Sequence, residues 1–486
     1  MIVAFESWIR SPLPRETVDV CVIGGGPAGI EVANTLARGR VRVLVLEGGD
    51  RSGAEASQSG YEFHETGQPL LGAGNEFRAA AVGAAADRVR MRCLGGTSAI
   101  WSGKWKLPDA IDFEDRPWVS SARWPLAWSE LEPFARGVMR DYGVPGRALL
   151  RDFRRGGACG PGGLRSVRHF EEAAPCRFAE KHAAMLEGSA DVCVVTGACV
   201  LALEPDGSRE RVASVVVGGA DGAVHRIEAR EFVLAVGGIE TARVLFASRA
   251  FCEAGAGNEH GHVGRGFMDH PKVRIGKVDA RGAAAADFLC GSPAERHRGV
   301  FRRVTLEPAL QRALRVPNHA LGFHTTEAPR ARWRSLLRPR ARTIGPLGAI
   351  LFLEQTENTR SRVRPSARRD AWGYPLAEVH WALNDADATG VRRFVEAIRP
   401  RMGDALGRWT FEAIPPPEAW SSGSHHMATS RMATSAAGGV VDRECRVFSI
   451  HNLHVAGTAV FPVGGNANPM ILLLALARRL AARLLR

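Results

Sequence analysis

The stretch VDVCVIGGGPAGIEVANTLARGRVRVLVLEGGD, residues 18–50, decides the fold of this protein. Its first six residues form an apolar run that predicts a buried parallel strand, and residues 27–37 carry a helical pattern. A second apolar run at 41–46 predicts the next strand. Strand, helix and strand in this order form a βαβ unit, so the chain begins as an α/β protein.

The glycine pattern Gly24-x-Gly26-x-x-Gly29 spans the turn after the first strand and the first residues of the helix. Gly24 permits the tight turn, Gly26 lets the backbone approach a pyrophosphate, and Gly29 lets helix and strand touch. Glu47 ends the second strand, where its carboxylate can accept hydrogen bonds from ribose hydroxyls and would repel the 2′-phosphate of NADP. The pattern predicts a Rossmann-type dinucleotide-binding domain, and this unit alone does not separate FAD from NAD.

The composition indicates a globular chain of more than one domain. A length of 486 residues exceeds what one hydrophobic core normally serves, and 45% hydrophobic residues can build a large core. The net charge of +13 attracts anions. No helix-turn-helix, zinc-finger or RNA-binding signature accompanies that charge, so we expect no nucleic-acid partner.

Cysteine usage and hydropathy predict a cytoplasmic protein. The nine cysteines are scattered without a CxxC pair, which favours a reducing compartment. The first residues carry charges where a signal peptide keeps its apolar run, and no window is long enough to span a bilayer.

Several further segments resemble the glucose-methanol-choline (GMC) oxidoreductases, which are FAD enzymes that oxidise alcohols. The resemblance lies in LGGTSAIWSGKWKLPDAIDFEDRPWV (94–119), WPLAWSELEPF (124–134), FVLAVGGIETARVLFAS (232–248) and the closing residues 425–486. VGRGFMDHP (263–271) and LEQTENTRSRVRP (353–365) are similar to the bacterial sugar-oxidising branch of that family. The resemblance covers most of the chain and is weakest at about 140–190 and 276–345.

The resemblance implies two domains. The Rossmann-type FAD-binding domain would be discontinuous, and the second would be an α+β substrate-binding domain built on an antiparallel sheet. The expected boundaries are 14–135, 190–275 and 421–486 for the FAD-binding domain, and 136–189 and 276–420 for the substrate-binding domain. Strand patterns at 212–217 and 232–236 agree with a return of the chain to the nucleotide-binding sheet.

Two adjacent histidines in SHHMATSRM, residues 424–432, are the candidate bases. The family's active-site histidine precedes the threonine of an H-x-x-G-T pattern by four residues, and counting back from Thr429 reaches His425. The family glycine is Ala428 here. Neighbouring side chains of an extended segment point to opposite faces, so we expect only His425 to face the flavin and His426 to pack elsewhere.

A metal site and a core histidine without a catalytic role are two other interpretations of this pair. Adjacent imidazoles do not readily chelate one ion and no nearby Cys or carboxylate completes a set, so no metal is expected. A core histidine without a catalytic role is the alternative for either residue. The reaction should fade as the pH drops through the pKa of the base, which is the ordinary imidazole value of ~6.5 shifted by whatever the pocket imposes.

Asn468 and Pro469 open the last helix. Asparagine is a preferred N-cap and proline suits the first helical position, so a purely structural role is one interpretation. The resemblance adds that Asn468 faces the substrate hydroxyl. It also implies that the helix N-terminus, with its partial positive charge, faces the flavin.

The resemblance also implies which other residues contact FAD. Besides the glycine turn and Glu47 they are Gly96, Thr97, Ser98, Val200, Gly457, Thr458, Pro469 and Met470. Some family members attach the flavin covalently through a histidine after the paired glycines. Ile100 occupies that position here, so FAD is expected to be bound noncovalently.

The implied reaction converts a CH–OH group to a ketone or an aldehyde by hydride transfer to FAD while a neutral His425 takes the hydroxyl proton. The sugar-branch segments favour a sugar, an aminosugar or a sugar-containing natural product. Four tryptophans of the second domain are candidates for stacking on pyranose faces, namely Trp372, Trp381, Trp409 and Trp420. The alternatives are a nonsugar alcohol, such as a sterol or a polyketide, and a lyase reaction.

No motif identifies the electron acceptor, which is oxygen or another acceptor. One basic stretch, residues 330–342, holds six arginines around Trp333. It is interpreted either as a solvated loop or as a weak contact with an anionic surface.

Overall fold

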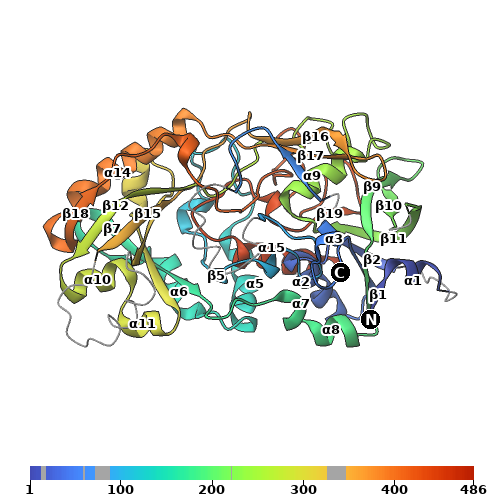
Figure 1. Ribbon diagram of the computed structural model, residues 1–486, viewed down its shortest axis with the longest axis horizontal. Coiled ribbons are helices and arrows are strands. Elements are labelled where there is room, and N and C mark those ends of the chain that lie inside the picture. Colours follow the sequence, from blue (N-terminus) through green and yellow to red (C-terminus); the bar gives the residue numbers. More distant parts are fainter. Residues whose placement is uncertain (12–17, 59–60, 72–87, 220–221, 326–345) are drawn as a thin grey trace.

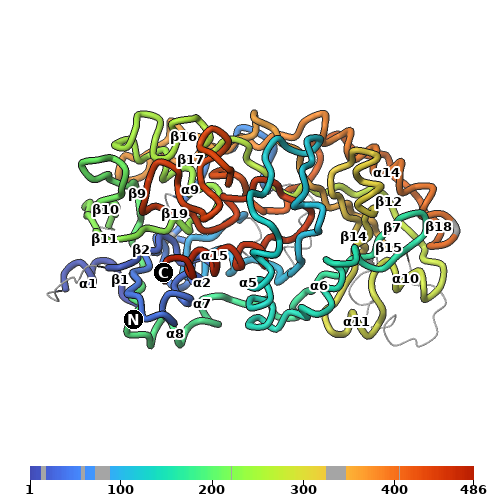
Figure 2. Tube along the Cα trace, turned by 180° about the vertical axis from the view of Figure 1, so that it is seen from behind, coloured from blue at the N-terminus to red at the C-terminus, as the bar shows by residue number. Residues whose placement is uncertain are grey.

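The computed structural model describes residues 1–11, 18–58, 61–71, 88–219, 222–325 and 346–486. The basic stretch 330–342 lies outside these residues. Two eight-stranded sheets occupy opposite ends of the long axis, and both chain termini lie at the end of the first sheet (Figures 1 and 2). Among the described residues, no helix has both the length and the apolar character needed to cross a membrane.

The first sheet is the nucleotide-binding sheet. Its order is β1 (Ile2–Ala4), β8 (Val192–Thr196), β3 (Val43–Glu47), β2 (Val18–Ile23), β11 (Val224–Leu234), β10 (Val212–Gly218) and β9 (Cys199–Pro205), with β19 (Leu453–Val455) also beside β11. The strands from β1 to the end of β11 run parallel, and β10 and β9 continue antiparallel. The predicted strand–helix–strand unit is β2, α2 (Pro27–Arg38) and β3.

Close approach explains two glycines of this unit. A Cβ on Gly29 would lie 1.9 Å from the carbonyl oxygen of Gly24, because α2 packs directly on the turn. Gly24 has a φ of +104°, and a Cβ there would lie 2.7 Å from the oxygen of Ala235 at the end of β11. Larger residues at either position would therefore push the helix or the strand away.

The second sheet is antiparallel throughout, as predicted. Its order is β18 (Gly407–Phe411), β12 (Lys272–Ala280), β15 (Leu347–Phe352), β14 (Ala320–Thr325), β13 (Val300–Leu306), β7 (Leu164–Glu171) and β5 (Lys104–Trp105), with β6 (Ala158–Cys159) beside β7. The helices α14 (Asp385–Leu406) and α10 (Gly282–Cys290) contribute to its hydrophobic core.

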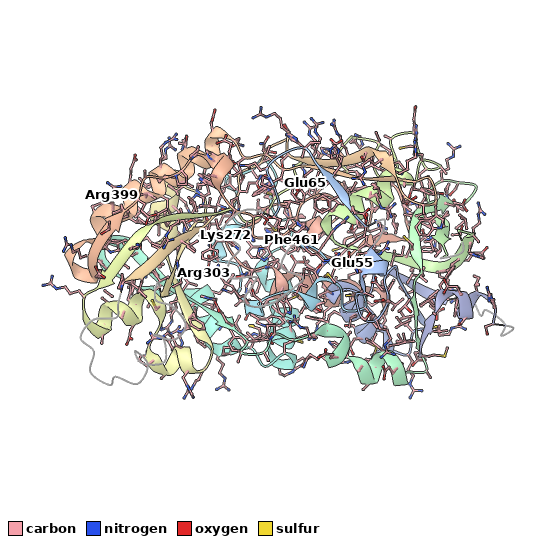
Figure 3. The ribbon with its side chains drawn as sticks, in the orientation of Figure 1. Glu55, Glu65, Lys272, Arg303, Arg399 and Phe461 are labelled. Carbon is pink, nitrogen blue, oxygen red and sulfur yellow. The ribbon has the colours of Figure 1, made fainter. Side chains whose placement is uncertain are left out.

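Side chains alternate between the two faces of the second sheet. Val304 and Leu351 are buried in the core that includes α14. Their neighbours Arg303 and Phe352 point the other way, toward the middle of the molecule, as does Lys272 on β12 (Figure 3). The alternation of side chains along each strand thus places charged residues of this sheet on the side that faces the first sheet.

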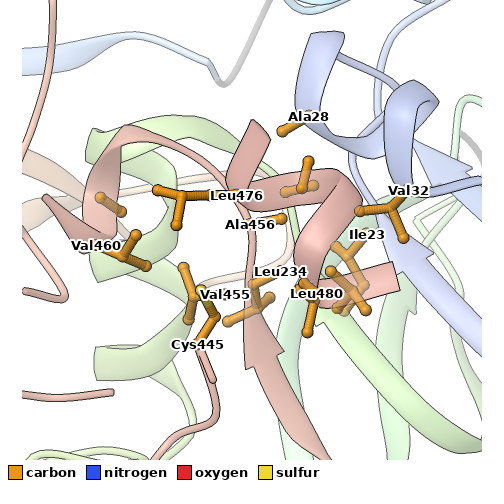
Figure 4. Packing of buried hydrophobic residues seen from close by; sticks show 14 of the residues in the cluster. Ile23, Ala28, Val32, Leu234, Cys445, Val455, Ala456, Val460, Leu476 and Leu480 are labelled. Atoms are coloured by element: carbon orange, nitrogen blue, oxygen red, sulfur yellow. The ribbon is translucent and has the colours of Figure 1, made fainter. Parts of the chain in front are cut away.

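The last helix, α15 (Met470–Leu484), joins the closing segment to the first sheet. Its Leu476 and Leu480 pack among Ile23 of β2 and Leu234 of β11 (Figure 4). A buried ion pair also holds it, because Arg478 Nε donates to Glu31 Oε1 of α2 at 2.6 Å. The helix is therefore fixed against the nucleotide-binding unit along its length.

The remaining helices cover the two sheets and the space between them. They are α1 (Phe5–Ile9), α3 (Glu55–Gln58), α5 (Trp128–Asp141), α6 (Gly146–Arg155), α7 (Phe178–Lys181), α8 (Ala183–Gly188), α9 (Gly237–Ala247), α11 (Pro293–His297) and α12 (Pro308–Leu314). Short 3-10 turns occur at Gly96–Ala99, Ala110–Phe113, Pro161–Gly163, Pro417–Ala419 and Thr458–Val460.

The strands do not follow the expected domain boundaries everywhere. Strand β5 lies in the second sheet, although 14–135 was expected to be FAD-binding. Strands β16 (Arg362–Arg369) and β17 (Pro375–His380) pair with β4 (Phe63–Glu65) and contact α9, although 276–420 was expected to be substrate-binding. Strand β1 precedes the expected start at residue 14, and β12 begins at Lys272. We propose a two-domain division in which 362–380 lies on the nucleotide-binding side.

Candidate active site

One cavity of about 740 Å³ lies between the two large sheets. The carboxyl ends of β2, β3 and β11 border it on one side, and β12, β13 and β15 border it on the other. The predicted site residues that line it are Gly24, Gly26, Glu47, Gly96, Thr97, Ser98, Val200, His425, Gly457, Thr458, Asn468, Pro469 and Met470. Gly29 does not line it, because its place is the contact between α2 and the glycine turn.

The first-sheet side of the cavity fits a dinucleotide. A Cβ on Gly26 would meet its nearest atom only at 3.9 Å, so the backbone there is open to the cavity. Glu47 accepts hydrogen bonds from the backbone N–H groups of Gly25 and Gly49, both at 2.8 Å. A carboxylate has about four acceptor sites, so Glu47 retains capacity for ribose hydroxyls, and FAD would be held by these residues.

The segment after the paired glycines closes this side. The Ser98 hydroxyl donates to the Gly95 oxygen at 2.6 Å and accepts from the Phe178 N–H at 3.2 Å, so it holds the turn in place. Thr97 Oγ1 accepts from the N–H of Met91 at 3.3 Å. Ile100 lines the cavity with carbon atoms only, which cannot form a covalent bond to a flavin.

His425 lies beside a second histidine that the sequence analysis did not single out. His425 Nδ1 and His270 Nδ1 are 2.7 Å apart. His270 Nε2 lies 3.1 Å from the carbonyl oxygen of Gly464, to which it must donate. A neutral His270 therefore has an unprotonated Nδ1, which accepts from His425 Nδ1–H. This tautomer leaves Nε2 of His425 as a hydrogen-bond acceptor.

Asp269 holds the loop that carries His425. Its carboxylate accepts from the backbone N–H groups of His425 at 2.9 Å and Gly423 at 3.1 Å, and from the Ser422 hydroxyl at 2.5 Å. Burial raises the pKa of Asp269, but the charges of His426 and His425 and these hydrogen bonds hold it below its ordinary value. Asp269 is thus an ionised anchor for the histidine loop.

Burial lowers the pKa of His425 well below the ordinary imidazole value; the charge of Asp269 opposes this shift, and the charge of Lys272 adds to it. The cavity thus shifts the pKa of this imidazole downward from its ordinary value of ~6.5. His425 is neutral throughout the physiological range. Within the described residues, no group of His, Cys, Asp and Glu side chains is arranged to hold a metal ion.

His426 also borders the cavity, and that only His425 faces the flavin stays a prediction. The ring centroid of His426 lies 5.8 Å from that of Phe267, and its carbonyl oxygen accepts from the Thr458 hydroxyl at 2.6 Å. The prediction assumed a regular extended segment. Ser424 and Ala428 instead have φ values of +57° and +70°, so the alternation of side chains is broken on both sides of the pair.

Asn468 does not cap the last helix as expected. Helix α15 begins at Met470 with Pro469 at its N-cap, and no side chain caps it. The Asn468 Oδ1 accepts instead from Arg303 Nη2 at 3.0 Å, while Arg303 Nη1 donates to the Asn466 oxygen at 3.1 Å. Because Arg303 occupies Oδ1, the Nδ2 amide group of Asn468 remains for another partner.

A buried ionic network fixes the turn before Asn468. Arg116 donates to both oxygens of Glu354, at 2.6 and 2.7 Å, and Glu354 Oε1 also accepts from the N–H of Gly465 at 3.1 Å. The neighbouring Gln355 accepts from the N–H of Asp269 at 3.0 Å. The Glu-Gln pair of the LEQTEN segment thus contacts both the turn before Asn468 and the segment that carries Asp269.

The four tryptophans proposed to stack on a sugar do not line the cavity. Trp381 and Trp420 are buried in the two large cores, and Trp372 packs near Leu201 and Val216 of the first sheet. Trp409 stacks on Phe411 with the ring centroids 5.4 Å apart. The hydrophobic packing of these rings accounts for them, and the stacking hypothesis is wrong for all four.

Sequence reasoning missed four residues near the histidines, namely Asp269, His270, Lys272 and Arg303. The first two lie within VGRGFMDHP, where the family-like segment was a signal that could have drawn attention to them. Arg303 lies within 276–345, where the resemblance is weakest and the sequence has many arginines.

The comparisons with known proteins agree with this architecture. A family model described as GMC oxidoreductase matches residues 357–477. The chain is 26% identical over 514 residues to 6'''-hydroxyparomomycin C oxidase of Streptomyces lividus, covering 95% of this chain and 90% of that protein. It is 25% identical to the fructose dehydrogenase large subunit of Gluconobacter japonicus, over 60% of this chain and 54% of the relative.

Solved structures share the fold over nearly the whole chain. Pyridoxine 4-oxidase from Mesorbium loti is similar with a TM-score of 0.59 and 18% identity, covering 96% of this chain and 99% of that one. The dinucleotide turn, the antiparallel second sheet and the matched closing segment all fit one family. The chain is therefore similar to the GMC oxidoreductases over most of its length, and it is an FAD-dependent oxidoreductase.

Proposed function

We propose that this enzyme oxidises a CH–OH group of a sugar or a sugar-containing natural product to a ketone or an aldehyde. One observation carries the proposal: a single cavity is lined both by the glycine turn of the dinucleotide fold and by His425 and Asn468. The relatives named as a 6'''-hydroxyparomomycin C oxidase and a fructose dehydrogenase large subunit support a sugar-type substrate.

His425 would take the proton of the substrate hydroxyl. Its contact with His270 Nδ1 leaves Nε2 unprotonated, and burial keeps the ring neutral. A neutral imidazole within hydrogen-bond reach lowers the barrier for removing hydride from the carbinol carbon. Asp269 would be a positioning residue, because it holds the backbone N–H of His425 rather than its ring.

Asn468 would hold the same oxygen. Its Oδ1 is engaged by Arg303, so its Nδ2 group is the part that would donate to the alcohol. Bound FAD supplies the hydride acceptor. The N-terminus of α15, bordering the cavity through Pro469 and Met470, adds partial positive charge at the reacting end.

Several finer points belong to the same proposal. The electron acceptor is oxygen or another acceptor. A cytoplasmic location is supported by the nine cysteines, all of which are free thiols. A weak contact of 330–342 with an anionic surface rests on the sequence alone.

The test is anaerobic mixing of the purified holoenzyme with sugars, aminosugars, sterols and simple alcohols while the flavin absorbance is followed. Bleaching by sugars supports the proposal, and the product carbonyl is then identified by mass spectrometry. Bleaching only by a sterol or a simple alcohol would reassign the substrate class to a nonsugar alcohol. Turnover of a substrate without any bleaching would point to the lyase alternative.

A further inference from the structure

Arg303 is a buried cation without an ionic partner. It is 2% exposed, lines the cavity from β13, and its guanidinium carbon lies 3.9 Å from the ring centroid of Phe352. Among the described residues no carboxylate forms an ion pair with it, and its partners are the Asn466 carbonyl and the Asn468 amide oxygen. An arginine has five N–H groups, so three of them have no partner in the described chain.

Burying such a charge is unfavourable. Desolvation lowers the pKa of Arg303 to about 10, so the group still carries its charge at neutral pH. Buried charges in proteins are normally paired. A ligand that enters the cavity is therefore a natural source for the missing negative charge.

The surroundings of Arg303 add further positive charge. Lys272 on β12 is the direct cross-strand partner of Phe352 on β15, and the ring of Phe352 contacts Arg303. Figure 3 shows Lys272 and Arg303 on the same side of this sheet. Both cations act on the catalytic pair, since the charge of Lys272 lowers the pKa of His425 and that of Arg303 lowers the pKa of His270. The two cations thus flank the reacting end of the cavity.

The charges of two described carboxylates, Glu171 and Asp109, act on Arg303, but each has a lysine partner, and Asp109 is paired with Lys106 at 3.0 Å. Glu171 on β7 forms an ion pair with Lys104 at 3.0 Å and a hydrogen bond with His169 at 2.9 Å. The other acidic residues lining the cavity, Glu47 and Glu240, lie in β3 and α9 on the first-sheet side, with Asp370 directly after β16. Within the described part of the second-sheet wall, Arg303 therefore has no carboxylate as its ion-pair partner.

We infer that the alcohol oxidised in this cavity carries a carboxylate, which binds to Arg303 and Lys272 beside Phe352. This inference rests on the proposed function and narrows its substrate to an acidic sugar or a related hydroxy acid. The planar fork of a guanidinium matches the two oxygens of a carboxylate. A substrate with an ammonium group in the same place would meet two cations, so an aminosugar is disfavoured.

The inference is tested with ring ligands that have no hydroxyl group and cannot be oxidised. The probes are tetrahydropyran-2-carboxylate, its primary amide and 2-(aminomethyl)tetrahydropyran, which present an anion, a neutral group and a cation on one ring. Their dissociation constants for the oxidised holoenzyme are measured by calorimetry at pH 7.5. We expect the acid to bind at least about 10-fold more tightly than the amide, and the amine to bind most weakly.

Variants of Arg303 and Lys272 test whether these two residues cause the tighter binding of the acid. In Arg303→Met the ratio of acid to amide affinity should fall about 10- to 100-fold, whereas Arg303→Lys should keep part of it. Lys272→Met should lower the ratio in the same direction. Lys277→Met is the matched control, because Lys277 lies on the same strand but is exposed outside the cavity, and it should leave the ratio unchanged.

A purely positioning role of Arg303 toward Asn468 predicts a different result. It would lower the rate of flavin reduction in Arg303→Met without any preference for the acid over the amide. Equal binding of acid and amide to the unaltered protein overturns the inference, as does a preference that survives in Lys272→Met and in a folded Arg303→Met. Failure of every alcohol to reduce the flavin would instead refute the proposed function, because these binding constants do not depend on turnover.

Discussion

Replacing His425 by alanine removes the Nε2 acceptor that the His270 contact leaves unprotonated. Loss of a positioned general base slows proton transfer ~100- to 10,000-fold, which corresponds to about 2.7 to 5.4 kcal/mol of barrier. The fold should survive, because Asp269 is bound by the backbone N–H of His425, which the substitution retains. FAD retention should also survive, since the glycine turn and Glu47 are untouched.

The assay is stopped-flow reduction of the flavin under anaerobic conditions with one good substrate. His426→Ala is the matched control: its contact with the Thr458 hydroxyl uses the backbone oxygen, so the loop keeps its place and the rate should fall far less. Asn468→Ala should lie between the two, because it removes one donor to the substrate oxygen. If His426→Ala reduces the flavin slowly and His425→Ala reduces it at a nearly normal rate, the base is His426 and not His425. Normal rates of flavin reduction in both variants would refute a histidine base.

Three further predictions follow from the same contacts. The rate of flavin reduction should stay level from neutral pH to well below 6.5 and fall only where His425 becomes protonated. Lys272→Met should move that fall to higher pH, because it removes a positive charge that lowers the pKa of His425. An unchanged pH profile in this variant would contradict the reasoning. Arg116→Met should lower the free energy of unfolding by about 3–5 kcal/mol in urea denaturation, since Glu354 is left buried without its cation; a loss below about 1 kcal/mol would show that the pair is not critical. Acid precipitation should leave all FAD in the supernatant, because Ile100 offers no atom for a covalent bond, and colour in the pellet would show the opposite.

The nucleotide-binding unit could be predicted from the sequence. Residues 18–50 hold strand, glycine turn, helix and terminal acid within one short stretch, and each depends on neighbours close in the chain. The antiparallel nature of the second sheet came from the family resemblance, and the structure confirms it. The pairing of β16 and β17 with β4 was missed, because β4 and β17 are more than 300 residues apart and periodicity does not encode such partners.

Local sequence by itself determined the glycine turn, the position of Glu47 and the presence of a histidine pair before the last helix. Only the tertiary structure decided how that pair is used. His270 lies 155 residues before His425, and Arg303 lies 165 residues before Asn468, yet each pair is in hydrogen-bond contact. These contacts set the tautomer of the base and the orientation of the amide. Hydrogen bonds and buried charges depend on distance in space, and that distance exists only after the two sheets have closed around the cavity.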